Sequence, residues 1–279
     1  MTALPGPGRW RLRLRQVLAV TRLELRRCFR GRRLVGLTLL NLAPVAILLL
    51  AYFVGDDDLA RDSTPANLSQ IYAVMFATWM LRVSVFFTSA ALSIQLFRTE
   101  VLEKTLHYYL LAPVRREVMV GGKFLAASLA SSIICGVSAA GAYLALFGWM
   151  GRGMGRFFLA GPGSAHLLAY LGVTVLGCFG YGAVFALLGL VWRNPTLSVL
   201  ALFGWESVLF LLPPVLKAVT VLFYLESLLP HRPPVGPLAI LAEPPPPLAT
   251  IAGMAVFVLA VLALAGWRAR RMEIAYSTD

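Results

Sequence analysis

Two charged side chains lie inside otherwise apolar stretches of the sequence, and they are its strongest candidates for functional chemistry. Arg82 stands about eleven residues into one such stretch and Glu206 about ten into another. A charge near the middle of a bilayer is costly, by at least a few kcal/mol, and usually faces a bundle interior or a cavity. Their similar depth predicts that they pair, within one chain or across a dimer. A structural pair, a contribution to a translocation path and separate partners all remain open.

Patterns for ATP hydrolysis and metal binding are incomplete in this sequence. The only Gly-Lys pair, Gly122-Lys123, has Glu117 where the first glycine of a P-loop belongs and Phe124 where a hydroxyl is needed. The three cysteines and three histidines form neither a CxxC nor a Cys/His cluster, which argues against a zinc or redox site. We therefore expect no catalytic residue, no metal site and no cofactor site on this chain.

The elements that position the two charges are predicted to be membrane helices. Of 279 residues, 59% are hydrophobic and 14% are charged, whereas soluble domains carry about 25% charged residues. About 20 apolar residues are needed to cross a bilayer core, and six stretches reach that length without the alternation of barrel strands. The sequence thus predicts an all-α integral membrane protein with six transmembrane helices, at residues 34–54, 71–97, 124–149, 166–192, 196–216 and 248–267.

The distribution of Lys and Arg predicts the orientation of these helices. With the N-terminus inside, nineteen basic residues lie on the inner side and five on the outer side. Because basic residues near helix ends stay in the cytoplasm, both termini, including the tail 268–279, are expected there. We expect the membrane itself to be a plasma membrane, the inner membrane of a bacterium. The formal charge of +12 lies beside the membrane, so contact with anionic lipids explains it better than binding of nucleic acid does.

The N-terminal segment, residues 1–33, is predicted to form a basic amphipathic helix. One face carries apolar side chains and another carries arginines: Leu14, Leu18, Leu25 and Cys28 against Arg11, Arg15, Arg22 and Arg26. Such a helix lies in the headgroup plane and leads into the first span. A solvated basic tail that only fixes the topology is the alternative.

A second charged segment, residues 98–123, follows the second span on the inner side and reads RTEVLEKTLHYYLLAPVRREVMVGGK. It opens with Glu100 and Glu103, continues with apolar residues, and reaches Pro113, which ends a helix. A short helix, a proline, the basic pair Arg115-Arg116 and a new helix together predict a rigid cytoplasmic protrusion. Such a protrusion is suited to contact with a soluble partner.

This segment resembles the signature of permease subunits of type-2 ATP-binding cassette (ABC-2) transporters. The shared pattern is E-x-x-E-x-T-L-x-x-x-L-L-x-P-x-R-R from Glu100 to Arg116, followed by Gly122-Lys123 at the opening of the third span. The amphipathic start around Arg22-Leu23-Glu24-Leu25-Arg26 and six spans with both ends inside are similar to that family as well. The resemblance therefore covers the whole chain.

The resemblance implies that residues 98–123 hold a coupling helix that docks in a groove of a separate ATPase subunit. It assigns to the docking element Glu100, Glu103, Thr105, Leu106, Leu110 and Pro113, and to its anchoring at the membrane surface Arg115 and Arg116. It also implies an exporter with two ATPase copies, which bind the ATP and Mg²⁺, and a second permease chain, identical or homologous. An ordinary charged loop is the alternative for this segment.

The identity of the cargo stays open at this stage. Within the family, the chain could serve as a haem, lipid or polysaccharide exporter permease, and the apolar interior favours amphipathic or lipidic cargo over ions. Outside transport, a non-transporting membrane scaffold and a membrane-embedded enzyme are the alternatives. The enzyme would need convergent polar residues in the bilayer beyond the two charges found.

Two segments are predicted to connect spans on the outer side. Residues 55–70, which include three successive aspartates, are expected to form a polar loop. Residues 217–247 combine the apolar stretch 217–229, which is too short to span, with eight prolines between 230 and 247. The stretch 217–229 predicts a re-entrant or interfacial helix, and the resemblance makes the proline-rich part an external lid, with a plain connecting loop as the alternative.

The fourth span is rich in glycine, which predicts close packing. Gly177, Gly180 and Gly182 lie within a few turns of one another, and small residues let neighbouring helix backbones approach closely. The tetrapeptide Phe179–Gly182 also has the letters of a potassium filter, but a filter sits in a re-entrant loop and this one lies inside a span.

Overall fold

The structure is a computed structural model that describes residues 7–31, 33–54, 64–102, 116–151, 153–192, 195–208, 220–231 and 246–271. For residues 7–10, 33, 98–102, 116, 149, 195 and 271 it describes the backbone alone. Nearly all the described residues are helical and none is in a strand, which confirms the all-α fold. In chain order the elements are α1 (Pro7–Cys28), α2 (Arg33–Val54), α4 (Pro65–Met75), the π-helical η1 (Phe76–Val85), α5 (Phe86–Leu102), α7 (Arg116–Phe147), the 3-10 turn η2 (Gly148–Met150), α8 (Gly153–Leu159), α9 (Gly163–Val191), α10 (Pro195–Ser207), α12 (Val221–Ser227) and α13 (Pro247–Arg271).

Five helices within the described residues are long and apolar enough to cross a membrane. They cover the predicted spans at 34–54, 71–97, 124–149, 166–192 and 248–267 almost completely, because they run over Leu34–Val54, Pro65–Phe97, Glu117–Phe147, Gly163–Val191 and Pro247–Arg270. The second of them joins α4, η1 and α5 without a break.

The second span begins earlier than predicted, and residues 65–70 are helical where a loop was expected. Thr64 caps the helix, since its hydroxyl oxygen accepts a 3.4 Å hydrogen bond from the backbone N–H of Asn67. Pro65 occupies the first helical position, where its missing N–H leaves nothing unsatisfied. The capping pattern therefore outweighs the polar composition of this stretch.

The predicted fifth span, residues 196–216, corresponds to a shorter helix in the described part of the chain. The helix α10 has 13 residues, or about 20 Å, which is less than the ~30 Å of a bilayer core. Residues 209–219 lie outside the described residues.

The short helix α12 lies within the stretch 217–229 for which a re-entrant or interfacial helix was predicted. Its residues Val221, Leu222 and Leu225 are buried, and it packs against α9, α13 and η1. It is thus inserted among the other helices. The proline-rich residues 232–245 lie outside the described residues.

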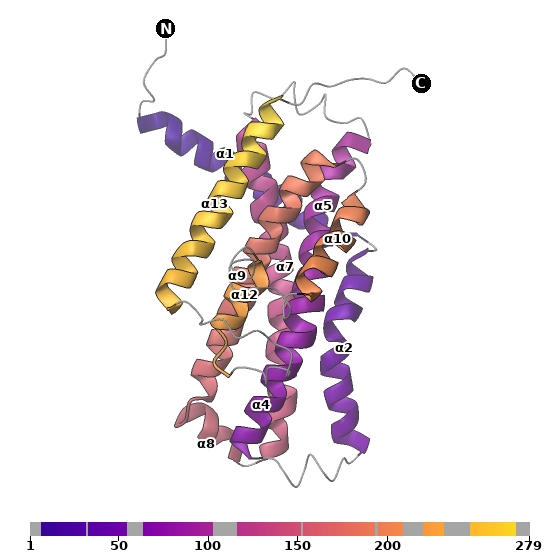
Figure 1. Ribbon diagram of the computed structural model, residues 1–279, viewed down its shortest axis with the longest axis vertical. Helices are drawn as coiled ribbons and strands as arrows, with labels where there is room; N and C mark the ends of the chain where they lie inside the picture. The colour runs from indigo at the N-terminus through magenta and orange to yellow at the C-terminus, as the bar shows by residue number, and fades with distance from the viewer. Residues whose placement is uncertain are drawn as a thin grey trace.

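The bundle has a well-packed centre, and α2 and α13 lie at its periphery (Figure 1). The helices α5, α7 and α9 pack against one another, with α2 and α13 on opposite flanks. A buried aromatic group of Tyr72, Tyr143 and Tyr170 joins three of the spans, and the Tyr72 hydroxyl donates a 2.8 Å hydrogen bond to the carbonyl oxygen of Ala139. Few residues of α2 and α13 are buried, so their apolar faces are left for lipid or for a partner.

The glycines of α9 lie at close contacts, as their spacing predicted. A Cβ added at Gly182 would lie 2.7 Å from the Ser128 hydroxyl on α7, and one at Gly177 would lie 3.0 Å from the Leu225 side chain on α12. A Cβ added at Gly180 would clash with the Met254 side chain on α13. These three positions let α7, α12 and α13 pack directly on α9.

Candidate functional site

The first candidate site lies around Arg82, which the π-helical segment η1 carries into the bundle. A π-helical stretch within an α-helix is frequent at functional sites. The Arg82 guanidinium Nη2 donates a 3.1 Å hydrogen bond to Oε1 of Glu226 on α12, and this contact is also an ion pair. The prediction that Arg82 pairs with Glu206 within the chain is therefore wrong.

The reason for this error lies in how α12 is placed. The stretch around Glu226 is too short to cross a bilayer, so the sequence suggested that its one carboxylate faced the outer water. In the structure, the buried side of α12 packs on the bundle and directs Glu226 to η1. The position of a residue in the sequence indicates its depth in the membrane only when the residue belongs to a full-length span.

Glu206 is buried and has a different partner. On α10 it accepts a hydrogen bond from the hydroxyl of Tyr181 on α9. The backbone N–H groups of Val221 and Leu222, at the start of α12, also interact electrostatically with this carboxylate. Glu206 thus relates the end of α10 to the start of α12.

The two contacts form one polar centre, made of Arg82, Glu206, Glu226 and Tyr181. Its four side chains come from η1, α10, α12 and α9, and the charges of Arg82 and both carboxylates act on the Tyr181 hydroxyl. With one guanidinium and two carboxylates, the centre is a place where four helices are held by charge in an apolar surrounding. The centre therefore joins four helices through charged and hydrogen-bonded side chains.

The second candidate site is the end of the bundle that carries α1, Leu102 of α5, Arg116 of α7 and Arg271 of α13, here called the basic end (Figure 1). The predicted docking element falls here. Glu103, Thr105, Leu106, Leu110, Pro113 and Arg115 lie outside the described residues, and Glu100 and Arg116 are described as backbone only. The structure fixes where this segment starts and ends: it joins α5 to α7, two helices that pack together.

The helix α1 packs tightly on the start of α7, directly beside this segment. Lys123 Nζ lies 3.9 Å from Oε1 of Glu24 and donates a 2.7 Å hydrogen bond to the carbonyl oxygen of Leu96 on α5. The Thr21 hydroxyl donates to the carbonyl oxygen of Gly122 at 3.2 Å. A Cβ at Gly122 would lie 2.7 Å from the Val20 side chain, so the two helices touch at this glycine.

The buried side of α1 includes polar residues that the sequence did not indicate. Thr21 and Glu24 are buried together with Cys28 of the predicted apolar face, whereas Leu14 and Leu18 of that face are exposed. Burial and the nearby Glu24 carboxylate raise the pKa of the Cys28 thiol to about 11. Leu12, Leu14, Leu18 and Leu23 are thus exposed, whereas Leu25 is partly buried against the bundle.

Two further contacts join segments that are distant in sequence. Glu117 at the start of α7 forms an ion pair with Arg270 near the end of α13, again at the basic end. At the other end of the bundle, the rings of His166 and His231 meet with centroids 4.7 Å apart, although nothing in their spacing predicted it. The first contact adds α13 to the helices held together beside residues 103–115.

Comparison with known families gives one clear match. The model of the ABC-2 family transporter protein matches residues 29–205, which include α2 to α9, most of α10 and the whole segment 98–123. No curated protein matches the chain. A match over more than half of the sequence agrees with the apolar helices and with the signature between Glu100 and Arg116. The chain therefore belongs to the ABC-2 family of transporter proteins.

Proposed function

We propose that this multi-pass membrane protein is the permease subunit of an ATP-driven exporter, powered by a separate ATPase that docks on residues 98–123. An ATPase subunit is the general kind of partner with which members of this family work. ATP and Mg²⁺ bind to that partner and not to this chain. The observation that carries the proposal is that the family match includes the docking pattern, in a segment whose two ends belong to the packed helices α5 and α7.

The proposed docking element acts through the helices that flank it. Glu100, Glu103, Thr105, Leu106, Leu110 and Pro113 contact the ATPase, and Arg115 and Arg116 anchor the segment at the membrane surface. Movement of the segment displaces α5 and α7, its two neighbours in the chain. Because Lys123 contacts both Glu24 and Leu96, α1 moves with them.

The same movement reaches the polar centre along continuous helices. The helix α5 is continuous with η1, which carries Arg82, so a tilt of α5 displaces Arg82 relative to Glu226 on α12. We infer that this contact changes during transport and that α12, with the proline-rich residues after it, acts as a gate on the outer side. Closely packed helices deform little, so a shift of one helix moves its neighbours from one packing arrangement to another.

Six spans with both termini in the cytoplasm form part of this proposal. The helix α1 and the end of α13 lie at the same end of the bundle, so an even number of crossings joins them (Figure 1). Five candidate spans and the helix α10, which covers part of the predicted fifth span, support six. The exposed leucines of α1 support an interfacial helix in the headgroup plane, and the basic residues support a cytoplasmic basic end in a bacterial inner membrane.

The working transporter is proposed to contain two permease chains and two ATPase copies. The two ATP sites of a cassette transporter form between paired ATPases, so each ATPase needs a docking element. The partner permease is identical or homologous. The sparsely buried faces of α2 and α13 leave room for its contact and for membrane lipids.

The proposal is tested by purifying the tagged chain from native membranes in mild detergent and identifying what accompanies it. We expect a P-loop ATPase in about equal amount with the wild type, and its loss with Glu100→Ala/Glu103→Ala. The matched control, Asp57→Ala/Asp58→Ala, removes two carboxylates from the predicted outer loop and should leave the ATPase bound. A chain that purifies alone, or an ATPase retained equally by all three proteins, would contradict the docking assignment.

A further inference from the structure

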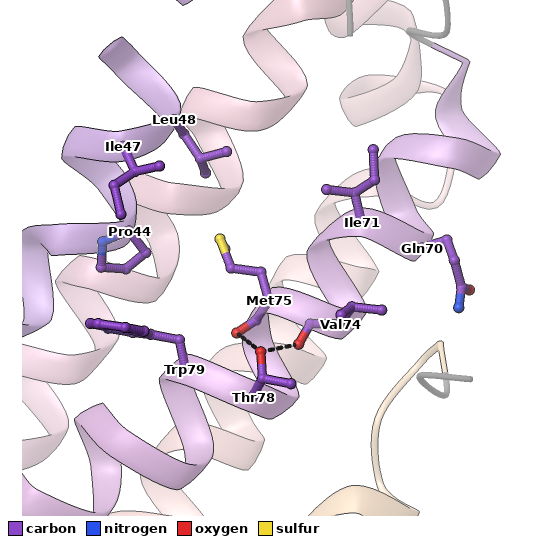
Figure 2. Close-up of a pocket in the computed structure, with 9 residues that line it drawn as sticks. All are labelled: Pro44, Ile47, Leu48, Gln70, Ile71, Val74, Met75, Thr78 and Trp79. Carbon is purple, nitrogen blue, oxygen red and sulfur yellow. Dashed lines mark hydrogen bonds between the residues drawn. The ribbon is translucent and has the colours of Figure 1, made fainter. Parts of the chain in front are cut away.

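An apolar groove runs between α2 and the continuous helix formed by α4 and η1 (Figure 2). Its volume is about 560 Å³, within the range of ligand pockets in proteins. The wall on α2 includes Ile47 and the wall on α4 includes Val74, and Gln70 and Trp79 mark its two ends along α4 and η1. We call it the α2–α4 groove.

The end of the groove near the middle of the bundle is closed by a contact between the two helices. Pro44 has no backbone N–H, so the carbonyl oxygen of Leu40, four residues earlier, lacks its helical partner. The indole Nε1 of Trp79 donates a 3.4 Å hydrogen bond to that oxygen. Figure 2 shows the Trp79 ring pointing toward Pro44. The indole therefore satisfies the carbonyl and forms the floor of the groove.

The walls of the groove offer hydrocarbon to an occupant. The Thr78 hydroxyl donates to the carbonyl oxygen of Val74 at 2.7 Å, one turn earlier in its own helix, as the dashed lines of Figure 2 show. The Trp79 N–H is already bonded to α2. Met75, an unbranched and adaptable side chain, adds a surface that can adjust to a flexible ligand.

The dimensions of the groove match one leaflet of a bilayer. From Gln70 to Trp79 the helix rises about 13 Å, close to half of the ~30 Å hydrocarbon core. The groove opens on the half of the bundle where α2 ends at Val54 and α4 begins at Pro65, opposite the basic end. An extended hydrocarbon chain that lies along this length between the two helices fits both the length and the apolar lining of the groove.

We propose that the α2–α4 groove binds one acyl chain of a membrane phospholipid, with the headgroup at the level of Thr64 to Gln70. Both walls belong to candidate membrane spans, so the mouth of the groove faces hydrocarbon and not water. Because lipid tails are as apolar as leucine, the preference for this site comes from packing on two helices at once. The proposal needs only that the chain is embedded in a membrane, and it is independent of the ATPase.

The test uses the full chain, reconstituted without any ATPase in vesicles that contain phosphatidylethanolamine with a diazirine in one acyl chain. After illumination, mass spectrometry maps the labelled peptides. We expect labels to concentrate on residues 44–48 and 70–79. Ile47→Trp and Val74→Trp fill the groove from its two walls, and each should abolish this concentration of labels.

The matched control is Val137→Trp, the same change as Val74→Trp at a similar depth. Val137 on α7 is 64% exposed. It lies two residues before Ala139, whose carbonyl oxygen accepts the hydrogen bond of Tyr72 on α4. Tyr72 directly follows Ile71, a lining residue of the groove. Labelling of the groove should persist in this variant. Ile47 is itself 61% exposed, so Ile47→Trp leaves the core intact, which an unchanged elution volume would verify.

Two outcomes would overturn the proposal. Labels spread evenly over all exposed helix faces would mean that lipids only solvate the groove. An unlabelled groove, together with a lower dimer fraction in Ile47→Trp, would mean that a second copy of the chain covers it. Either result leaves the association with an ATPase unaffected, so the two proposals fail separately.

Discussion

The buried pair of Lys123 and Glu24 gives the sharpest test of how α1 is attached. The side chains are 2% and 0% exposed, and Lys123 Nζ also holds the carbonyl oxygen of Leu96. Lys123→Met keeps most of the aliphatic stem and removes the ammonium. The change leaves the Glu24 carboxylate buried without its neighbour on α7.

The expected cost follows from the environment of this carboxylate. Removing one partner of a buried ion pair typically costs about 3–5 kcal/mol. Arg27 Nη1, 4.0 Å from the other oxygen of Glu24, remains and offsets part of this loss. We therefore expect about 3 kcal/mol, and at 2–4 °C per kcal/mol for chains of this size the apparent Tm should fall by roughly 6–12 °C.

Thermal unfolding in detergent, followed by tryptophan fluorescence at one fixed scan rate, measures this effect. Arg22→Met removes an exposed cation from the same helix and should leave the Tm unchanged. The double variant Glu24→Gln/Lys123→Met leaves neither charge buried, so it should recover most of the loss. A Lys123→Met protein as stable as the wild type, or a double variant no more stable than the single one, would refute the account of this contact.

Three further predictions concern separate contacts. Arg82→Glu should lower the Tm, since a hydrogen bond between charged groups contributes about 1.5–3 kcal/mol. The exchange Arg82→Glu/Glu226→Arg should restore the Tm. A double variant that melts no higher than Arg82→Glu would contradict the ion pair. Gly122→Ala should destabilise the protein by about 1–3 kcal/mol, because the new methyl group would lie 2.7 Å from an α1 side chain. The control Gly121→Ala, whose methyl group meets nothing within 4 Å, should be neutral or stabilising. Equal melting curves for the two variants would refute the contact. Burial and a carboxylate one turn away raise the pKa of Cys28 to about 11, so its side chain stays a thiol at pH 8–9. Because the thiolate is the reactive form, the rate of Cys28 alkylation, measured by peptide mass spectrometry, should still increase between pH 9 and 10. A rate that reaches a plateau at pH 9 would contradict this.

The sequence predicted the membrane helices well because a run of about 20 apolar residues has few other solutions in a bilayer. Their bounds were less certain, since apolarity marks the part of a helix inside the hydrocarbon and not its ends. The helix α7 begins at Arg116, eight residues before the predicted span at 124, because charged residues continue the helix beyond the membrane. At 64–65 the capping pattern of Thr64 and Pro65 decided the start instead.

The polar contacts were harder to predict because they join segments whose relative placement depends on the whole fold. Equal depth suggested that Arg82 pairs with Glu206. In the structure, Arg82 forms its ion pair with Glu226 of α12, and Glu206 accepts a hydrogen bond from Tyr181. Hydropathy treats each span separately and therefore gives no information on such neighbours.

The contact of α1 with α7 has a signal in the sequence that lies outside its apolar face. Glu24 is the only acidic residue among the first 33, which hold ten basic ones. It shares a helical face with Thr21 and Cys28, at spacings of three and four residues. A lone acid on a face with small residues, in a strongly basic helix, indicates a protein contact rather than a headgroup contact.

The central claim is that an ATPase docks on residues 98–123, and site-specific photo-crosslinking in native membranes tests it most directly. A photoreactive residue at Leu106 should give an adduct with a P-loop ATPase, identified by mass spectrometry. The same residue at Asp57, in the predicted outer loop, should give no such adduct. A Leu106 position that labels only lipid or this chain itself, or an ATPase captured equally from Asp57, would contradict the account.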